Sequence, residues 1–227
     1  MYQDVFDDKK QTEMRKYFQN DLSKLGVIKT YRKNHFIDSN CCNSFAIVLK
    51  GKIVKSIVSS QGREKQLYIL RPGEIFGEMN LLGGGALHYV CRVKENAQIS
   101  YISKEVLDKT IEKNSEVYKY LINSMTRKFH IVLLQLTNNT FNDSRGRIAE
   151  ALLRLTACSD NANVEENTSI ISTVYTQNEL AHNVGCSRVT VTRVLKKFVQ
   201  EKLISIRNRK IIINDMDTLV SYTDRIQ

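Results

Sequence analysis

The 227-residue sequence has no hydrophobic run that approaches the roughly 18 residues needed for a membrane-spanning helix. Its first eight residues are acidic and lack the basic-then-apolar order of a secretory signal. These two absences predict a cytoplasmic protein that has no membrane partner.

The sequence also lacks the spacing of a disulfide framework or a metal site. Its cysteines are odd in number and contain no C-x-x-C pair: Cys41, Cys42, Cys91, Cys158 and Cys186. An odd count without a signal argues against disulfides, and the spacing suits neither structural zinc nor an iron–sulfur cluster. The four histidines show no metal-ligand spacing either. We therefore expect no metal site.

Motifs for catalysis are missing as well. Gly77-Glu78 and the run Gly83-Gly84-Gly85 are rich in glycine, but no G-x-x-x-x-G-K-[ST] sequence is present. There is no nucleophile elbow. The sequence predicts that the protein is not an enzyme.

Basic residues, in contrast, are abundant. The formal net charge is +10 and the sequence pI is about 9.4. Between Ser187 and Ile213, Glu201 is the single acidic residue opposed to a cluster of basic ones: Arg188, Arg193, Lys196, Lys197, Lys202, Arg207, Arg209 and Lys210. Such a cluster favours a polyanionic partner, and nucleic acid in particular.

The first half of the chain has the pattern of a β-rich domain. Apolar positions at helical spacing over 10–25 end at Gly26, and short apolar runs follow up to about residue 102. Residues 45–49 and 52–58 predict two strands joined by a tight turn at Lys50-Gly51. Three further strands are expected at 66–70, 88–93 and 98–102. Several short strands of this kind are typical of a sandwich or barrel.

A single long helix is predicted next, over about residues 114–139. Its apolar positions alternate three and four apart, as in a heptad seam: Ile122, Met125, Phe129, Val132 and Leu136. The seam is explained either by packing on the β-rich domain or by a parallel helix from a second subunit, and we favour the second subunit. The polar stretch 138–144 predicts a hinge or helix break. A further helix is expected from Ser144 to Cys158.

The strongest local signal lies near the C-terminus. Thr176 and Glu179 have the spacing of a capping box, and Gly185 supplies a turn residue that tolerates positive φ. Ser187 can cap a second helix, from Arg188 to about Lys202, whose expected inward face is Val191, Val194, Leu195, Phe198 and Val199. This order of signals predicts a helix-turn-helix.

The opposite face of the second helix carries residues suited to DNA. Arg188, Val189, Thr192, Arg193 and Lys196 recur three and four apart, as on a helix that enters the major groove. Arginine can contact guanine with two hydrogen bonds, whereas lysine mostly neutralises phosphate. Residues 203–206 and 210–213, joined by a basic tip, predict a hairpin wing.

Three separate motifs resemble one known family. The segment 184–193 is similar to the recognition motif of the Crp/Fnr superfamily of bacterial transcription regulators. Residues 143–149 resemble the start of the DNA-binding domain of that superfamily, and residues 71–78 resemble the turn of its cyclic-nucleotide-binding β-roll. The resemblance covers essentially the whole chain in the family's order.

The resemblance implies an α+β protein with three parts. An N-terminal β-roll (jelly-roll-like) sensor domain would span 1–113, a long dimerisation helix with a hinge 114–140, and a winged helix-turn-helix domain 141–227. The implied partners are duplex DNA with a palindromic site, a second copy of the chain and RNA polymerase. The expected DNA-binding residues are Thr176, Gln177, Ser187, Arg188, Val189, Thr192, Arg193, Lys196, Arg207, Arg209 and Lys210.

The expected effector site departs from the cAMP-binding members. Those members carry an Arg-Ser pair about ten residues after the Gly-Glu, and the arginine neutralises the cyclic phosphate. Here that stretch is Leu87, His88 and Tyr89, and Val132-Leu133 stands where the long helix of those members offers hydroxyls. Without the arginine, a buried phosphate lacks its main partner. We predict that cAMP is not the effector. The expected effector-binding residues are Gly77, Glu78, Leu87, His88, Tyr89, Val132 and Leu133.

Several hypotheses about the effector stay open. His88 could hold haem, a weakly polar pocket could take a small apolar or aromatic molecule, or the factor could need no effector.

The recognition helix also departs from the family pattern, because many members place a glutamate where Val189 stands. Valine can pack on a thymine methyl but accepts no hydrogen bond, so an altered half-site is expected. The alternative function is a cyclic-nucleotide- or haem-binding sensor that acts on protein partners rather than DNA.

Overall fold

The computed structural model describes residues 8–38, 44–83, 89–157, 169–170, 175–208 and 210–224. Its contacts divide the described chain into two units, with the boundary in the sequence after Ile131. We call 6–131 the N-terminal unit and 132–227 the C-terminal unit. None of the described helices is long and apolar enough to cross a membrane.

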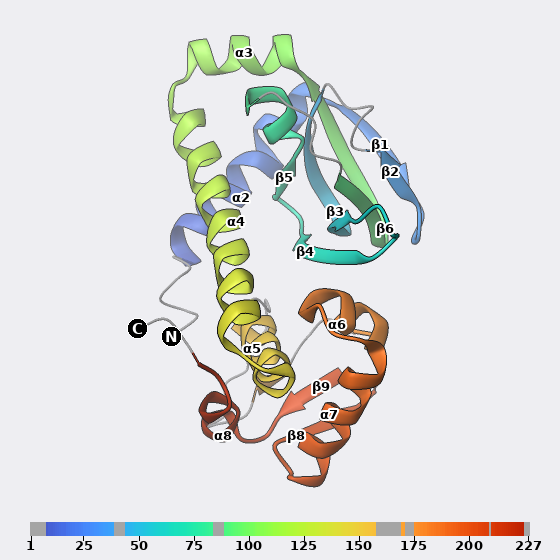
Figure 1. The fold of residues 1–227 in the computed structure, drawn as a ribbon. Helices are drawn as coiled ribbons and strands as arrows, with labels where there is room; N and C mark the ends of the chain where they lie inside the picture. Colours follow the sequence, from blue (N-terminus) through green and yellow to red (C-terminus); the bar gives the residue numbers. More distant parts are fainter. Residues whose placement is uncertain are drawn as a thin grey trace. The chain divides into compact units, whose positions relative to one another are not determined.

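The N-terminal unit begins with a helical segment, as predicted for 10–25. Helix α2 (Asp8–Asn20) is drawn in blue in Figure 1. The 3-10 turn η1 (Leu22–Leu25) follows it, and Gly26 ends this segment. A side chain at Gly26 would meet the Ser100 hydroxyl and the Tyr101 carbonyl oxygen closer than 3 Å, so glycine is required here for packing. Strands β1 (Val27–Tyr31) and β2 (Phe36–Asp38) follow.

The predicted hairpin at 45–58 is wrong. Residues Ser44–Val58 form one continuous strand of 15 residues, β3. Gly51 has φ +80 within it, and the pairing of β3 with its neighbour shifts register at three places between Val48 and Ile53. A glycine with positive φ next to register shifts is the geometry of a β-bulge, which bends a strand without ending it. The sequence signal for a turn therefore marked a bulge.

The two strands expected at 88–93 and 98–102 are likewise one strand, β6 (Tyr89–Ser103). It pairs along its length with β3, so that each long strand supports the other. Strand β4 (Glu64–Leu70) is where 66–70 predicted it, and β5 (Ile75–Phe76) and the short π-turn η3 (Met79–Gly83) follow. The sheet order is β1-β6-β3-β4, with β2 on β6 and β5 on β3.

Helix α3 (Lys104–Lys113) leads into α4 (Glu116–Phe141), the long helix predicted for 114–139. The division between the two units falls inside α4, after Ile131. Within the N-terminal unit, Tyr120 of α4 stacks on Tyr17 of α2 with ring centroids 4.6 Å apart. Buried side chains from α2, β3, α3 and α4 form one core around them: Met14, Phe18, Phe45, Ile47, Leu107, Val117 and Leu121.

The heptad seam of α4 is exposed in the described chain. Ile122, Phe129 and Leu136 are each about three-fifths exposed, at 61%, 62% and 61%, and Met125 and Val132 are also exposed. The buried residues of α4 occupy the other side, at Val117, Leu121, Ser124, Lys128, Ile131, Gln135 and Asn138. The β-rich domain therefore does not bury the seam, in contrast to the first of the two explanations.

The C-terminal unit packs helices around a small sheet. After the end of α4 come α5 (Ser144–Ala157), β7 (Ser169–Ile170), α6 (Gln177–Val184), α7 (Arg188–Gln200), β8 (Ile204–Arg207), β9 (Lys210–Ile213) and α8 (Met216–Ser221). The sheet order is β7-β9-β8. Strands β8 and β9 form the predicted hairpin, and α5 follows the predicted helix as far as Ala157, while Cys158 lies outside the described residues.

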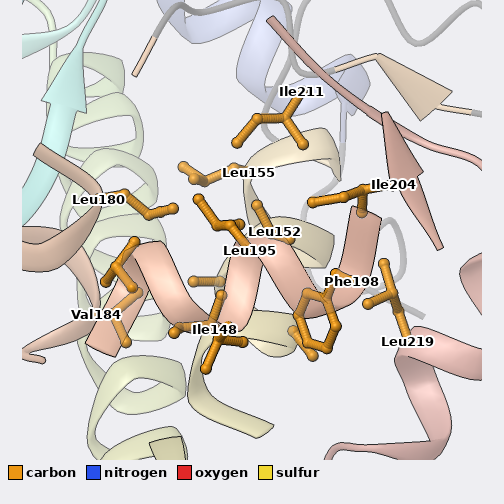
Figure 2. Close-up of a cluster of buried hydrophobic side chains, with 14 of the residues drawn as sticks. Ile148, Leu152, Leu155, Leu180, Val184, Leu195, Phe198, Ile204, Ile211 and Leu219 are labelled. Atoms are coloured by element: carbon orange, nitrogen blue, oxygen red, sulfur yellow. The ribbon is translucent and has the colours of Figure 1, made fainter. Parts of the chain in front are cut away.

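One apolar cluster holds this unit together. Figure 2 shows side chains from α5, α6, α7, β8, β9 and α8 pointing toward one another, among them Ile148, Leu152, Leu180, Val184, Leu195, Phe198, Ile204, Ile211 and Leu219. Ile148, Leu152 and Phe198 are 0% exposed. Burying side chains of this size contributes about 1.5–3 kcal/mol each, so the cluster fixes the angle between α6 and α7. The fold is the predicted α+β arrangement.

The polar stretch 138–144 breaks the helix as predicted, but it is bonded in place. Asn138 donates to the Glu150 carboxylate at 2.6 Å, and the Arg147 guanidinium donates to the carbonyl oxygens of Asn139 and Asn142 at 2.7 and 2.8 Å. The Asp143 carboxylate accepts from the Gly146 amide at 2.8 Å, which caps α5. The end of α4 is thus tied to the start of α5.

Candidate nucleic-acid interface and effector site

The two helices of the candidate DNA interface are each capped as their sequence requires. Thr176 and Glu179 form the predicted capping box, in which each side chain accepts from the other's amide at 3.1 and 2.8 Å. Gly185 ends α6 with φ +81, in the left-handed region that favours glycine. The Ser187 hydroxyl accepts from the Thr190 amide at 3.1 Å and begins α7.

The two faces of α7 are chemically distinct. Val191, Val194, Leu195 and Phe198 are buried, as predicted. Val199 was also expected inside, and this is wrong: it is 42% exposed. Val199 follows Phe198 by one residue, which is about 100° further around the helix, so it lies at the edge of the buried face. Val189, on the outer face, is 77% exposed.

The cations on the outer face of α7 are exposed to solvent. Arg188, Arg193 and Lys196 are exposed. Within the part of the chain that the structure describes, their side chains form no ion pair and no hydrogen bond. Three solvated cations along one helix face are available to phosphates or base edges.

A hydrogen bond between α6 and α7 positions two further candidates. Thr192 Oγ1 lies 2.7 Å from Gln177 Oε1 and 2.9 Å from the Arg188 carbonyl oxygen. Because Gln177 Oε1 accepts from Thr192, the amide N–H groups of Gln177 remain as donors at the start of α6. Donors at a helix start suit phosphate.

The hairpin wing carries the remaining cations. Arg207 and Lys210 lie opposite each other in the β8–β9 pairing, and both are exposed. Asn208 at the tip has φ +50, while Arg209 lies outside the described residues. Glu201, the single acid in this basic stretch, is paired with Arg145 at 2.6 Å. Because of this ion pair, the Glu201 carboxylate does not act as a counterion for the cations of α7.

Of the seven expected effector residues, the structure brings together three within one unit. Gly77, Glu78 and Tyr89 belong to the N-terminal unit, whereas Leu87 and His88 lie outside the described residues. Val132 and Leu133 belong to the C-terminal unit, and each is 38% exposed. Gly77 has φ +91, and a side chain there would lie 2.5 Å from the Ser44 carbonyl oxygen, so the backbone itself requires glycine.

Glu78 is held by a residue that the sequence interpretation missed. Lys128 of α4 donates to Glu78 Oε1 at 2.7 Å and to the Ile75 carbonyl oxygen at 2.8 Å. Both side chains are almost buried. Lys128 lies on the buried stripe of α4, three or four residues from Ser124 and Ile131. A lysine at such a position was the signal that could have revealed the pair.

The charges around Glu78 set its protonation. Burial alone raises the pKa of Glu78, but the ammonium groups of Lys128 and Lys55 together hold it below its usual value. Burial lowers the pKa of Lys55, and Glu78 offsets part of this effect. Burial also raises the pKa of the Tyr68 hydroxyl well above its usual value, so Tyr68 is neutral. The site thus combines two ammonium groups with one carboxylate.

A second buried carboxylate stands beside this site. Glu74 Oε1 lies 2.8 Å from both the Arg15 and the Arg127 guanidinium groups, and Glu74 Oε2 accepts from the Arg71 amide at 3.1 Å. These contacts join α2, α4 and the turn before β5. Within the described ranges, no three His, Cys, Asp or Glu side chains gather closely enough to hold a metal ion.

Comparisons with known proteins match both units. Residues 146–222 match the family model of a Crp-like helix-turn-helix domain, and residues 31–114 match that of a cyclic nucleotide-binding domain. The cAMP-activated global transcriptional regulator CRP of Haemophilus influenzae is 29% identical over 167 residues, which cover 73% of each chain.

Solved structures share the fold. CprK complexed with OCPA superimposes with a TM-score of 0.71 at 20% identity, covering 91% of this chain and 92% of CprK. The c-di-GMP responsive global regulator CLP of Xanthomonas campestris gives a TM-score of 0.70 at 19% identity, covering 91% of this chain and 99% of CLP.

Proposed function

We propose that this chain, which belongs to the Crp/Fnr family of transcription regulators, binds a palindromic site in duplex DNA as a homodimer. The observation that carries the proposal is the outer face of α7, where Arg188, Arg193 and Lys196 are exposed and have no partner among the described residues. A helix of this kind fits the major groove, with Arg188 and Arg193 toward bases or backbone and Lys196 toward phosphate.

The other residues of the interface have complementary roles. Gln177 donates to a phosphate while it orients Thr192, and Thr176 and Ser187 hold the two helix starts. Arg207, Arg209 and Lys210 of the wing neutralise phosphates beside the groove. Val189 packs on a base edge, which favours a thymine methyl at that position.

The homodimer rests on the exposed stripe of α4. Large apolar side chains, including Ile122, Phe129 and Leu136, repeat at three and four residues and stay exposed in one copy. A parallel second copy would bury both stripes, at about 1.5–3 kcal/mol for each large side chain. Two-fold symmetry then places the two recognition helices about one DNA turn apart, which is why the site is palindromic.

The proposed action is on transcription. Relatives are described as transcriptional regulators, and CRP as a global one. RNA polymerase is the expected protein partner, and action on the bacterial chromosome puts the protein in the cytoplasm.

The proposed effector is not cAMP. CRP is described as cAMP-activated, CprK was solved with OCPA, and CLP is described as c-di-GMP responsive, so this fold accommodates different effectors. In this chain Lys128 already holds one oxygen of Glu78. Calorimetric titration of the full chain with cAMP is expected to show no binding at micromolar concentrations, and heat of binding in that range would contradict this part of the proposal. An absorbance spectrum of the purified protein without a haem band is the companion expectation.

DNA selected from a random pool provides the decisive test. Fluorescence anisotropy with a selected duplex is expected to show an affinity that falls steeply with salt, with a slope of about −0.9 for each neutralised phosphate. The selected sites should be two-fold symmetric. Val189→Glu should change the selected half-site, whereas Lys50→Ala, at an exposed position of β3, serves as the control. Salt-independent binding, or none, would instead favour a regulator that acts on protein partners.

A further inference from the structure

A lysine lies in the interior of the β-roll, in a row of inward-facing side chains. Lys55 of β3 stands directly opposite Tyr68 of β4 and Cys91 of β6. Directly opposite residues of a sheet share one face, and all three of these residues are buried. Lys55 is 3% exposed, and its ammonium lies 3.9 Å from the ring centre of Tyr89 and 5.9 Å from that of Tyr68.

Lys55 lacks a partner of its own. In the ranges that the structure describes, its ammonium forms neither an ion pair nor a hydrogen bond; two tyrosine rings lie close to it, and Glu78 is near enough to act on its charge. Burying an ammonium without an anion is costly. A fold that keeps such a group has a use for it beyond stability.

An acceptor faces the same interior. Glu78 Oε1 is taken by Lys128, but Glu78 Oε2 is buried and has no hydrogen-bond partner among the described residues. Its own backbone amide and Lys55 contribute to holding the carboxylate charged. Lys55 and Glu78 therefore leave one cation and one acceptor atom unsatisfied in the same buried space. The two lysines and one carboxylate also leave an excess positive charge there.

We propose that this row binds a small organic carboxylate that carries a hydroxyl or amine donor. The ligand's carboxylate would pair with the Lys55 ammonium, its donor would bond to Glu78 Oε2, and the rings of Tyr68 and Tyr89 would pack on its carbon skeleton. The inference rests on the proposed function in one respect, that the β-roll receives an effector. It adds the chemical class of that effector and assigns Lys55 as the residue that selects it.

The ligand also balances the charge of the site. Its carboxylate supplies the negative charge that the two lysines and Glu78 lack, while Lys128 keeps its bonds to Glu78 Oε1 and the Ile75 carbonyl oxygen. Because Lys128 belongs to α4, which continues to Phe141, ligand bound at Glu78 acts next to the long helix.

The test uses the full chain and a graded set of acids, without DNA. Calorimetric titration would compare glycolate, L-lactate, 3-hydroxybutyrate and 4-hydroxybutyrate with acetate, propionate and butyrate, which lack the hydroxyl donor. At least one hydroxy acid is expected to bind, and its counterpart without the hydroxyl to bind about tenfold more weakly, since a bond to a charged acceptor is lost. Lys55→Met should weaken the binding of that hydroxy acid by about tenfold or more, because the bond between its carboxylate and the Lys55 ammonium is lost.

Lys50→Met, an exposed lysine of the same strand, should leave the affinity unchanged. Three results would overturn the inference: no acid of the set binds, Lys55→Met binds as tightly as the unsubstituted chain, or cAMP binds more tightly than every acid. Should Lys55→Met fail to unfold cooperatively, the comparison between the hydroxy acids and their counterparts decides alone. The titration contains no DNA, so its outcome does not depend on whether the chain binds DNA in the separate anisotropy test.

Discussion

The basic residues around Glu74 and Glu78 and those on the outer face of α7 have opposite surroundings. In the N-terminal unit, Arg15, Arg127 and Lys128 each lie within 2.8 Å of a carboxylate oxygen that is itself buried. In the C-terminal unit, Arg188 and Arg193 of α7 are exposed and form no ion pair among the described residues. Whether a cation supports the fold or stays available for a polyanion therefore depends on its position in the fold and not on its residue type.

The difference follows from solvation. A buried charge is strongly destabilising unless a partner of opposite sign replaces its water, so Glu74 and Glu78 are surrounded by cations. An exposed cation keeps its water and needs no partner, so α7 can present several cations to solvent at little cost in stability. Lys55 is the exception in the N-terminal unit, because it is buried and yet has no anionic partner of its own.

The largest expected effect breaks the buried side of this comparison. Glu74→Gln leaves the Arg15 and Arg127 guanidinium groups without their shared carboxylate, and the free energy of unfolding is expected to fall by about 3–5 kcal/mol. Urea unfolding followed by circular dichroism measures it. The matched control is Glu95→Gln, whose partner Lys52 sits at the surface, with an expected loss under about 1 kcal/mol. Equal losses in the two variants would contradict the role given to burial.

Lowering the pH should abolish the difference in stability between the unsubstituted chain and Glu74→Gln. Although burial raises the pKa of Glu74, Arg127 and Arg15 hold it below its usual value. The unfolded chain therefore takes up the proton first as the pH falls. The stabilisation is complete above the unfolded pKa, about 4.3, and is lost as the pH falls through the lower folded pKa. Unsubstituted chain and Glu74→Gln should converge in stability across that window.

A second expected effect breaks the exposed side. Arg193→Ala should weaken binding to the selected duplex by about 1–3 kcal/mol at fixed salt, because it removes a contact to a base or the backbone. The same variant should unfold at the same urea concentration as the unsubstituted chain, since Arg193 is exposed. Unchanged affinity in a gel-shift at constant salt would remove Arg193 from the interface.

Lys55→Met sharpens the comparison, because it changes a buried lysine that forms no ion pair among the described residues. Methionine fills the same space without the cost of a buried charge, so the free energy of unfolding is expected to rise by about 1 kcal/mol or more at pH 7. Burial lowers the pKa of Lys55, so this cost is present at neutral pH and disappears as the pH rises toward the unfolded pKa near 10.4. Thermal unfolding at pH 7 and pH 10 measures both; a variant less stable at pH 7 would show that Lys55 supports the fold.

The smallest expected effect lies at the border of the basic stretch. Glu201→Gln releases Arg145, whose guanidinium also packs 3.7 Å over the Tyr222 ring. This partly exposed pair is worth at most about 1 kcal/mol, so stability should change little. Removing the acid should slightly tighten DNA binding and make the salt slope a little steeper. Weaker DNA binding would show that Arg145 must be held by Glu201 for α7 to dock.

Local signals predicted the C-terminal unit well. The cap at Thr176, the left-handed Gly185 and the cap at Ser187 depend on residues within four positions of one another, and all three are confirmed. Val199 was misplaced because burial at the end of α7 depends on which other elements reach that turn. The apolar period alone cannot supply that information.

The N-terminal unit was predicted less exactly. Gly51 has the same sequence signature in a hairpin turn and in a bulge, and the pairing of β3 with β6, about 40 residues further along the chain, decides between the two. Lys128 and Glu78 are 50 residues apart in the sequence, and no local pattern connects them.

The sequence by itself indicated the family, the order of the parts and the exposed basic side of α7, because caps, periodicity and clustered charge act over short stretches of chain. Only the tertiary structure decided that β3 and β6 run unbroken, that Lys128 holds Glu78, and that Lys55 is left without an anion. These outcomes depend on which distant side chains share one buried space, where water no longer screens a charge and an ammonium or carboxylate without an oppositely charged neighbour is destabilising.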